Sequence, residues 1–188
     1  MMFRPMLAAA LCGTALLASL AVPTALASDN GGQQIRLRDN CDPAGFPNNL
    51  CAPNHKGGIG LQQLLDFVHA RPQHVLEQRN ALGWRFSPDR THVKLGTTLA
   101  VNNEGGETHT FTQVAAFHDL GCIPPFSLAM FGTPAVDPIC PAPFVPPGPA
   151  VDPGGTLQVP LTQAGTFNFQ CFIHPWMRTT ITVEGKKS

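Results

Sequence analysis

Alternation of apolar and polar residues after Trp84 restricts this chain, more than any other feature, to a fold built from β-strands. This alternation is typical of half-buried strands, in which every second side chain points to the same face. Turn-forming residues separate the alternating segments, at Gly96, at 102–106 and at Gly165. The sequence therefore predicts a sandwich of two sheets. The alternating segments are 93–95, 97–101, 109–111, 167–171 and 177–183.

The region before Trp84 has a different periodicity. Apolar residues recur at i, i+3, i+4 and i+7 from Leu61 to Val68, which is the stripe of an amphipathic helix and predicts one over 60–70. The Arg71-Pro72 step should end this helix. A second helix is expected over 72–82, with proline in its first turn and Gly83 as its terminator.

Two segments are predicted to be irregular. Residues 28–58 are rich in Asn, Gly and Pro, and residues 115–155 contain ten prolines, which is too many for central strands. The expected organisation is an N-terminal extension over 28–83 and a sandwich domain over 84–188. The stretch at about 115–155 is expected to be a loop inserted into that domain.

The first residues predict export. Arg4 precedes an apolar run from Met6 to Val22, and Ala25-Leu26-Ala27 has the pattern of a cleavage site. We therefore expect residues 1–27 to be a signal peptide, cleaved after Ala27, and the mature chain to be periplasmic or secreted. No later segment is apolar for long enough to span a membrane.

Cysteine usage agrees with an oxidising compartment. Removal of residues 1–27 leaves five of the six cysteines, so four can pair and one remains. Proximity in sequence favours Cys41 with Cys51 and Cys122 with Cys140. A second metal site made by these four is the alternative, but disulfides are the expectation for an exported chain.

Charge argues against a nucleic-acid partner. The formal net charge is zero and only 13% of the residues are charged, so no basic field is available to hold phosphates. About 160 residues remain after export, which suits one domain with an extension. We expect a monomer.

The string from Cys171 to Met177 has the most specific chemistry. It offers a thiolate, an imidazole from His174 and a thioether within seven residues, and this donor set suits a copper ion held by Cys and His with a weak axial Met. Zinc rarely takes a thioether and prefers four strong ligands. Strand parity turns both sulfurs inward, whereas His174 in the intervening turn should keep its ring edge near solvent.

A second imidazole is needed to complete such a site. His109 begins the alternating segment after the glycine-rich turn, on a strand that can neighbour the Cys171 strand. His118 is the rival, but it lies nearer the start of the proline-rich stretch. The predicted ligands are His109, Cys171, His174 and Met177.

These residues resemble the cupredoxin family over about 84–184. The Cys-x2-His-x2-Met loop is most similar to that of amicyanins and related bacterial plastocyanin-like proteins, and Thr108-His109-Thr110-Phe111 matches the segment of the first His ligand. The resemblance implies an all-β, Greek-key β-sandwich, here with a short N-terminal helical extension, and one type 1 copper ion. It gives the ligand roles to the four residues named above.

The implied function is one-electron transfer to and from a protein redox partner, with His174 and its apolar rim as the route. Four filled coordination positions leave none for a substrate, so we expect no enzyme activity. Two alternatives remain open: a periplasmic copper-binding protein for delivery or tolerance, and a cupredoxin subunit for interaction within a larger redox complex.

Overall fold

The structure is a computed structural model that describes residues 33–140 and 145–185. The predicted signal peptide lies outside the described residues. None of the described helices is long and apolar enough to cross a membrane.

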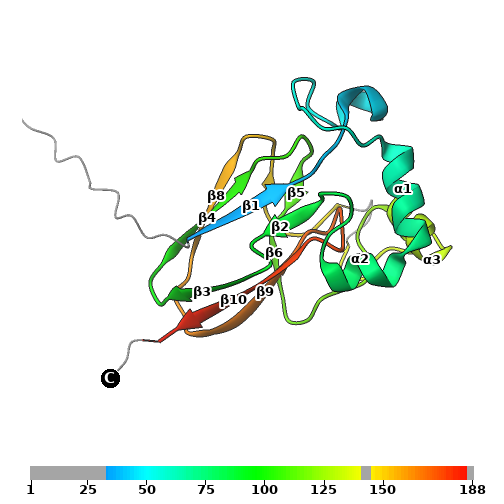
Figure 1. The fold of residues 1–188 in the computed structure, drawn as a ribbon. Coiled ribbons are helices and arrows are strands. Elements are labelled where there is room, and N and C mark those ends of the chain that lie inside the picture. The colour runs from blue at the N-terminus through cyan, green and yellow to red at the C-terminus, as the bar shows by residue number, and fades with distance from the viewer. Residues whose placement is uncertain (1–32, 141–144, 186–188) are drawn as a thin grey trace, which may run out of the picture.

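One sheet of the sandwich has the strand order β2-β1-β4-β8. β1 (Gln34–Arg38) pairs in parallel with β4 (Thr98–Asn103) and antiparallel with β2 (Arg85–Ser87), and β8 (Thr156–Pro160) closes the sheet against β4. In Figure 1 this sheet forms the upper layer of strands.

The second sheet has the order β3-β10-β9-β6. β10 (Arg178–Glu184) lies between β3 (Arg90–Lys94), which runs parallel to it, and β9 (Gly165–Gln170), which runs antiparallel. β6 (Thr112–Val114) continues the sheet beyond β9. A separate short ladder joins His109 and Thr110 in β5 to β7 (Ala150–Val151).

Side chains from both sheets fill one core. Phe111 stacks on Phe169 with ring centroids 4.4 Å apart, and Phe86 packs on Phe111 at 5.4 Å. The alternating segments after Trp84 thus form the predicted all-β, two-sheet sandwich. Further buried side chains of this core are Ile35, Leu37, Leu99, Val101, Ile181 and Val183.

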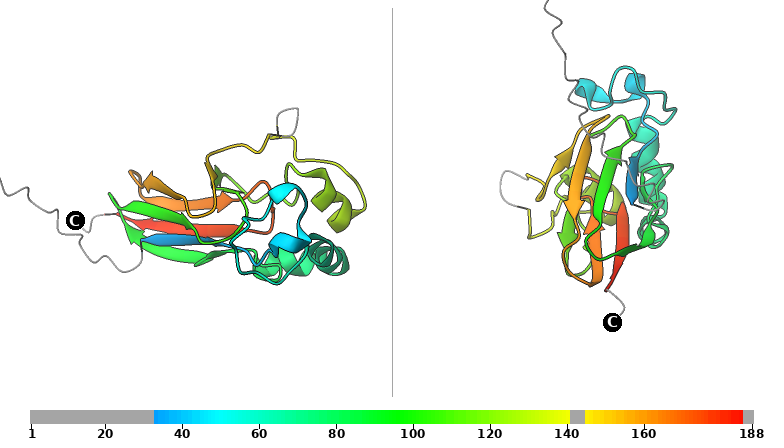
Figure 2. Two further views of the ribbon diagram at one scale, coloured as in Figure 1. Left: turned by 90° about the horizontal axis from the view of Figure 1, so that it is seen from above. Right: turned by 90° about the vertical axis from the view of Figure 1, so that its left-hand side faces the viewer.

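The helices gather at one end of the sandwich, away from the end at which β10 reaches the C-terminus (Figures 1 and 2). α1 (Leu61–Ala70) forms as predicted and packs against α3 (Pro124–Phe131). We call residues 41–70 and 122–132 the cap. The cap lies over the end of the sandwich that holds the Cys171 loop, as shown by the pocket that Phe46, Leu61, Phe126 and Ile173 line together.

Three details of the sequence interpretation were wrong. The segment 28–58 contains β1, so its start belongs to a sheet. The second helix, α2 (Pro72–Gln78), ends before Gly83, because Arg79 takes a left-handed backbone (φ 54°). The guanidinium of Arg79 is held by the carbonyl of Asp89 at 2.9 Å and by the ring of Phe117 at 4.8 Å.

The third concerns the proline-rich stretch, which contains α3 as well as loop. Pro124 and Pro125 occupy the first turn of this helix, where the missing N–H costs nothing, and Gly132 ends it at φ 71°. The sequence interpretation assigned these two prolines to a loop, but in the structure they begin a helix.

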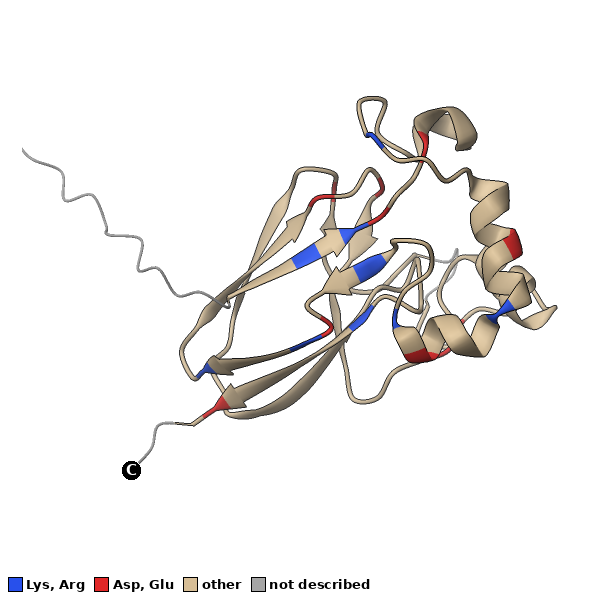
Figure 3. Ribbon diagram, viewed as in Figure 1, with Lys and Arg blue, Asp and Glu red and all other residues tan. Residues whose placement is uncertain are grey.

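Both predicted disulfides are present. Cys41 is bonded to Cys51, and Cys122 to Cys140. Among the described residues, Cys171 is the cysteine left without a disulfide, and it is buried. Charged residues of both signs are scattered over strands and helices (Figure 3).

Candidate metal centre

The loop between β9 and β10 is closed by its own backbone. The Cys171 amide donates to the Met177 carbonyl at 3.0 Å, and the Met177 amide donates to the His174 carbonyl at 2.9 Å. Because β9 and β10 pair up to Gln170 and Arg178, the hairpin holds the two sulfur residues side by side at its end. Both are fully buried, as strand parity predicts.

A second strand brings His109 to this loop. The Thr110 amide donates to Cys171 Sγ at 3.4 Å, and the Phe172 amide donates to Thr110 Oγ1 at 2.9 Å. These two bonds fix β5 against the hairpin. As a result His109 Nδ1 lies 4.0 Å from Cys171 Sγ, although the residues are 62 positions apart.

Three of the four predicted ligands therefore converge. One donor atom each from His109, Cys171 and His174 lies within 4.8 Å of the other two, and all three side chains have no exposed surface. Met177, in the same loop as Cys171 and His174, is also fully buried. The rival His118 lies elsewhere: its Nδ1 is 2.8 Å from Asp137 Oδ2, and its ring packs on Phe172.

The ring nitrogens of His174 fit a metal ligand. They are buried, and neither has a hydrogen-bond partner among the described residues. Leaving buried polar atoms unpaired costs roughly 1 to 3 kcal/mol. A soft cation among two imidazoles, a thiolate and a thioether would remove that cost, and this is the donor set that copper prefers.

The thiol of Cys171 is poised as a thiolate. Burial alone raises its pKa, but the neighbouring imidazoles of His109 and His174 hold that pKa well below the usual value. Burial lowers the pKa of His109, whereas its bonds to Asp39 and Cys171 raise it, to about 9 overall. These two shifts favour the thiolate, which is the form of cysteine that binds a metal cation.

The expectation that His174 keeps its ring edge near solvent was wrong. Phe126 of the cap covers the ring at 4.9 Å between centroids, and Trp176 and Trp84 lie at 5.5 and 6.4 Å. Trp176 is itself fully buried. The cap therefore separates the imidazole from the solvent. The spacing of Cys171, His174 and Met177 in the sequence does not reveal that such a cap is present.

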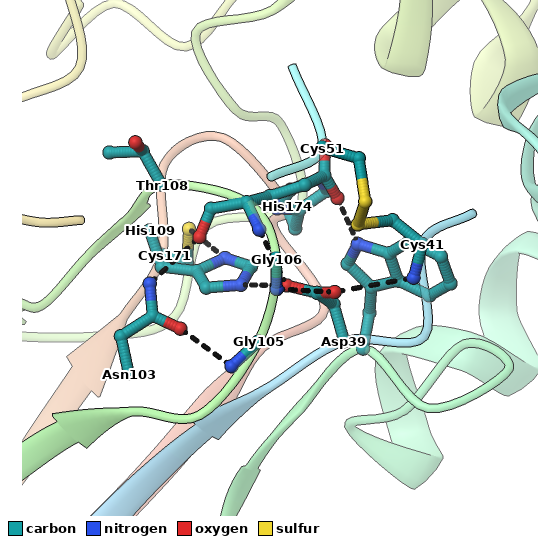
Figure 4. A network of polar contacts seen from close by, with 12 residues as sticks. Asp39, Cys41, Cys51, Asn103, Gly105, Gly106, Thr108, His109, Cys171 and His174 are labelled. Atoms are coloured by element: carbon teal, nitrogen blue, oxygen red, sulfur yellow. Dashed lines mark hydrogen bonds and ion pairs between the residues drawn. A yellow bond between two sulfur atoms is a disulfide. The ribbon is translucent and has the colours of Figure 1, made fainter. Parts of the chain in front are cut away.

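Sequence reasoning also missed two buried carboxylates beside the imidazoles. Asp39, just after β1, accepts a hydrogen bond from His109 Nε2 at 3.0 Å (Figure 4). Glu107 Oε2 lies 3.5 Å from His174 Nε2. The glycines of the loop at 105–106 were a usable signal, because a Cβ on Gly105 would meet the Asp39 carboxylate at 2.0 Å.

Comparison with known proteins gives matches in structure alone. No family model matches the chain, and no curated protein matches it in sequence. An amicyanin variant in its reduced Cu(I) form at pH 4 is 24% identical over 53% of this chain and 73% of its own, with a TM-score of 0.35. A purple cupredoxin from Nitrosopumilus maritimus is 17% identical over 54% of this chain and 83% of its own, also with a TM-score of 0.35.

An oxidised amicyanin variant is similar to the same extent, at 22% identity and a TM-score of 0.36 over 53% of this chain and 73% of its own. Each of these superpositions leaves nearly half of the chain unmatched. The chain's own architecture, two four-stranded sheets with the β9–β10 hairpin at one end, is the all-β, two-sheet sandwich that the sequence predicts.

Proposed function

We propose that this chain is an exported type 1 (blue) copper protein that carries single electrons. The ligands would be His109, Cys171 and His174, with Met177 as the weak axial donor. The observation that carries the proposal is the convergence of three fully buried donors within 4.8 Å, one of them, His109, 62 residues before Cys171. Bound at this site, copper would supply a one-electron Cu(II)/Cu(I) couple.

The residues of the chain are suited to that role. The hairpin bonds and β5 hold the donor atoms without help from solvent, so little needs to move when the charge at the site changes. The surrounding apolar side chains exclude water, which is one of the means by which a protein sets the potential of a metal. The four donors leave no coordination position for a substrate, which is the argument against an enzyme.

Burial favours a carrier over a copper-delivery protein. A site that hands its metal to another protein needs an accessible ligand, whereas all four proposed ligands are buried here. The partner is proposed to be a protein, which would exchange electrons across the layer of Phe126 and Trp176 instead of through an exposed imidazole. The two disulfides support an oxidising compartment, periplasmic or extracellular.

The test is the spectrum and electrochemistry of the purified copper-loaded protein. One copper per chain, intense thiolate-to-Cu(II) absorption in the visible and reversible one-electron reduction are expected. Rapid loss of Cu(I) to a chelator would favour delivery. A colourless Cu(II) form would contradict the proposal.

A further inference from the structure

Each imidazole of the candidate centre has its own buried carboxylate beside Nε2. These two carboxylates come from different places in the chain: Asp39 follows β1, and Glu107 lies in the turn before β5. Neither belongs to the group of donor atoms that meet within 4.8 Å, so they lie outside the ligand set.

Asp39 is held rigidly against His109. Its side chain has no exposed surface, and besides the 3.0 Å bond with His109 Nε2 it accepts three backbone N–H groups. These come from Cys41 at 3.2 Å and from Gly106 and Glu107 at 3.0 Å. Four hydrogen-bond donors fix the position of the carboxylate, and the carboxylate in turn fixes the orientation of the His109 ring.

Glu107 makes the corresponding contact with His174. Its side chain is 9% exposed, its Oε2 lies 3.5 Å from His174 Nε2, and the same oxygen accepts the indole N–H of Trp84 at 2.5 Å. Asn103 fixes the backbone at this point by donating to the Glu107 carbonyl at 2.7 Å. The indole thus holds the carboxylate beside the ring.

We propose that Asp39 and Glu107 are positioning residues for the two imidazoles, Asp39 through its hydrogen bond with Nε2 of His109 and Glu107 through its 3.5 Å contact with Nε2 of His174, and that they favour Cu(II) over Cu(I). This inference rests on the proposed function. A carboxylate on the outer nitrogen fixes the tautomer and orientation of a ligating imidazole and raises its basicity. Negative charge on a buried carboxylate near the centre also stabilises the more positive oxidation state.

The consequence is measurable in metal affinity and in potential. Loss of such a carboxylate typically reduces metal affinity by about 10- to 100-fold. Because the charge favours Cu(II), its removal should weaken Cu(II) binding more than Cu(I) binding. A tenfold change in the ratio of the two affinities corresponds to about 59 mV for one electron.

The experiment compares Asp39→Asn and Glu107→Gln with Glu104→Gln in the copper-loaded full chain. Glu104 is a matched control, because it lies in the same loop, loses the same charge, and is exposed in a pair with Arg36 and Arg38. Reduction potential, Cu(II) affinity by competition and the Cu(II) electron paramagnetic resonance spectrum are measured. The first two variants should raise the potential and lower Cu(II) affinity at least tenfold, with the control unchanged.

Failure of this inference can be distinguished from failure of the proposed function. If wild-type protein is blue and both buried variants match the control in potential and affinity, the inference is overturned while the proposed function stands. If Asp39→Asn does not fold, the Glu107→Gln result decides alone. A wild-type chain that binds no copper would overturn the function and the inference with it.

Discussion

The sandwich and the cap place the same centre in two different ways. The sandwich supplies the donors: the pairing of β9 with β10 places Cys171, and the hydrogen bonds of Thr110 hold β5, and with it His109, against the Cys171 loop. The cap supplies none of the proposed ligands, yet Phe126 and the pocket lining of the cap decide that His174 is buried. The residues that would bind the metal thus come from the sandwich, and residues of the cap isolate the site from solvent.

Replacement of the thiolate tests the sandwich half of this comparison and should have the largest effect. Cys171→Ser removes the one strong sulfur donor, so the visible absorption of the copper form should disappear entirely. The fold should remain, because the β9–β10 pairing does not depend on the sulfur. Absorption and circular dichroism check both points, and a blue Cys171→Ser protein would contradict the ligand assignment.

Truncation of the cap residue over His174 tests the other half. Phe126→Ala should lower the free energy of unfolding by about 3 kcal/mol, the low end for a buried Phe. Water should then reach the imidazole, so a chelator should remove Cu(I) at least several-fold faster.

Leu128→Ala is the matched control for that experiment, because it lies in the same helix and is 52% exposed. It should change neither the unfolding free energy nor the rate of copper removal by much. Equal rates for both variants would mean that the cap does not isolate the centre.

The disulfide in the insertion ranks next. Replacing Cys122 and Cys140 together by Ser removes a disulfide between residues that are 18 positions apart. The free energy of unfolding should fall by about 3 kcal/mol, and the spectrum of the copper form should not change. Denaturant unfolding under oxidising conditions measures the change in the free energy of unfolding. A lost or shifted absorption band would show that the cap also shapes the donor set.

The smallest effect is expected at the sheet surface. Arg38→Gln removes an exposed pair with Glu104, and such pairs contribute less than about 1 kcal/mol. Stability, potential and spectrum should all stay close to the wild type. A large change would mean that the sandwich surface is coupled to the centre.

The sandwich could be predicted from the sequence to a greater extent than the cap and its effect on the site. The strands and the Cys171 loop have local signatures, a period of two and a dense set of donor residues, and the structure brings His109 to them as parity suggests. β1 also alternates, at Ile35 and Leu37, but its glycine- and proline-rich flanks conceal it.

Burial of His174 has no local signature. It depends on α3 packing against α1 and on Phe126 reaching the ring, and both are contacts between segments far apart in the sequence. Asp39 and Glu107 are equally non-local, because an acidic residue in a loop reads as solvated until the chain closes over it. Only the glycine pair at 105–106 hints that a close approach is needed there.

The most direct test of the central claim is X-ray absorption at the copper edge of the loaded full chain. The account predicts one short copper–sulfur contact and two imidazole nitrogens, from the thiolate of Cys171 and the rings of His109 and His174. A copper surrounded by nitrogen and oxygen without a short sulfur contact would contradict it.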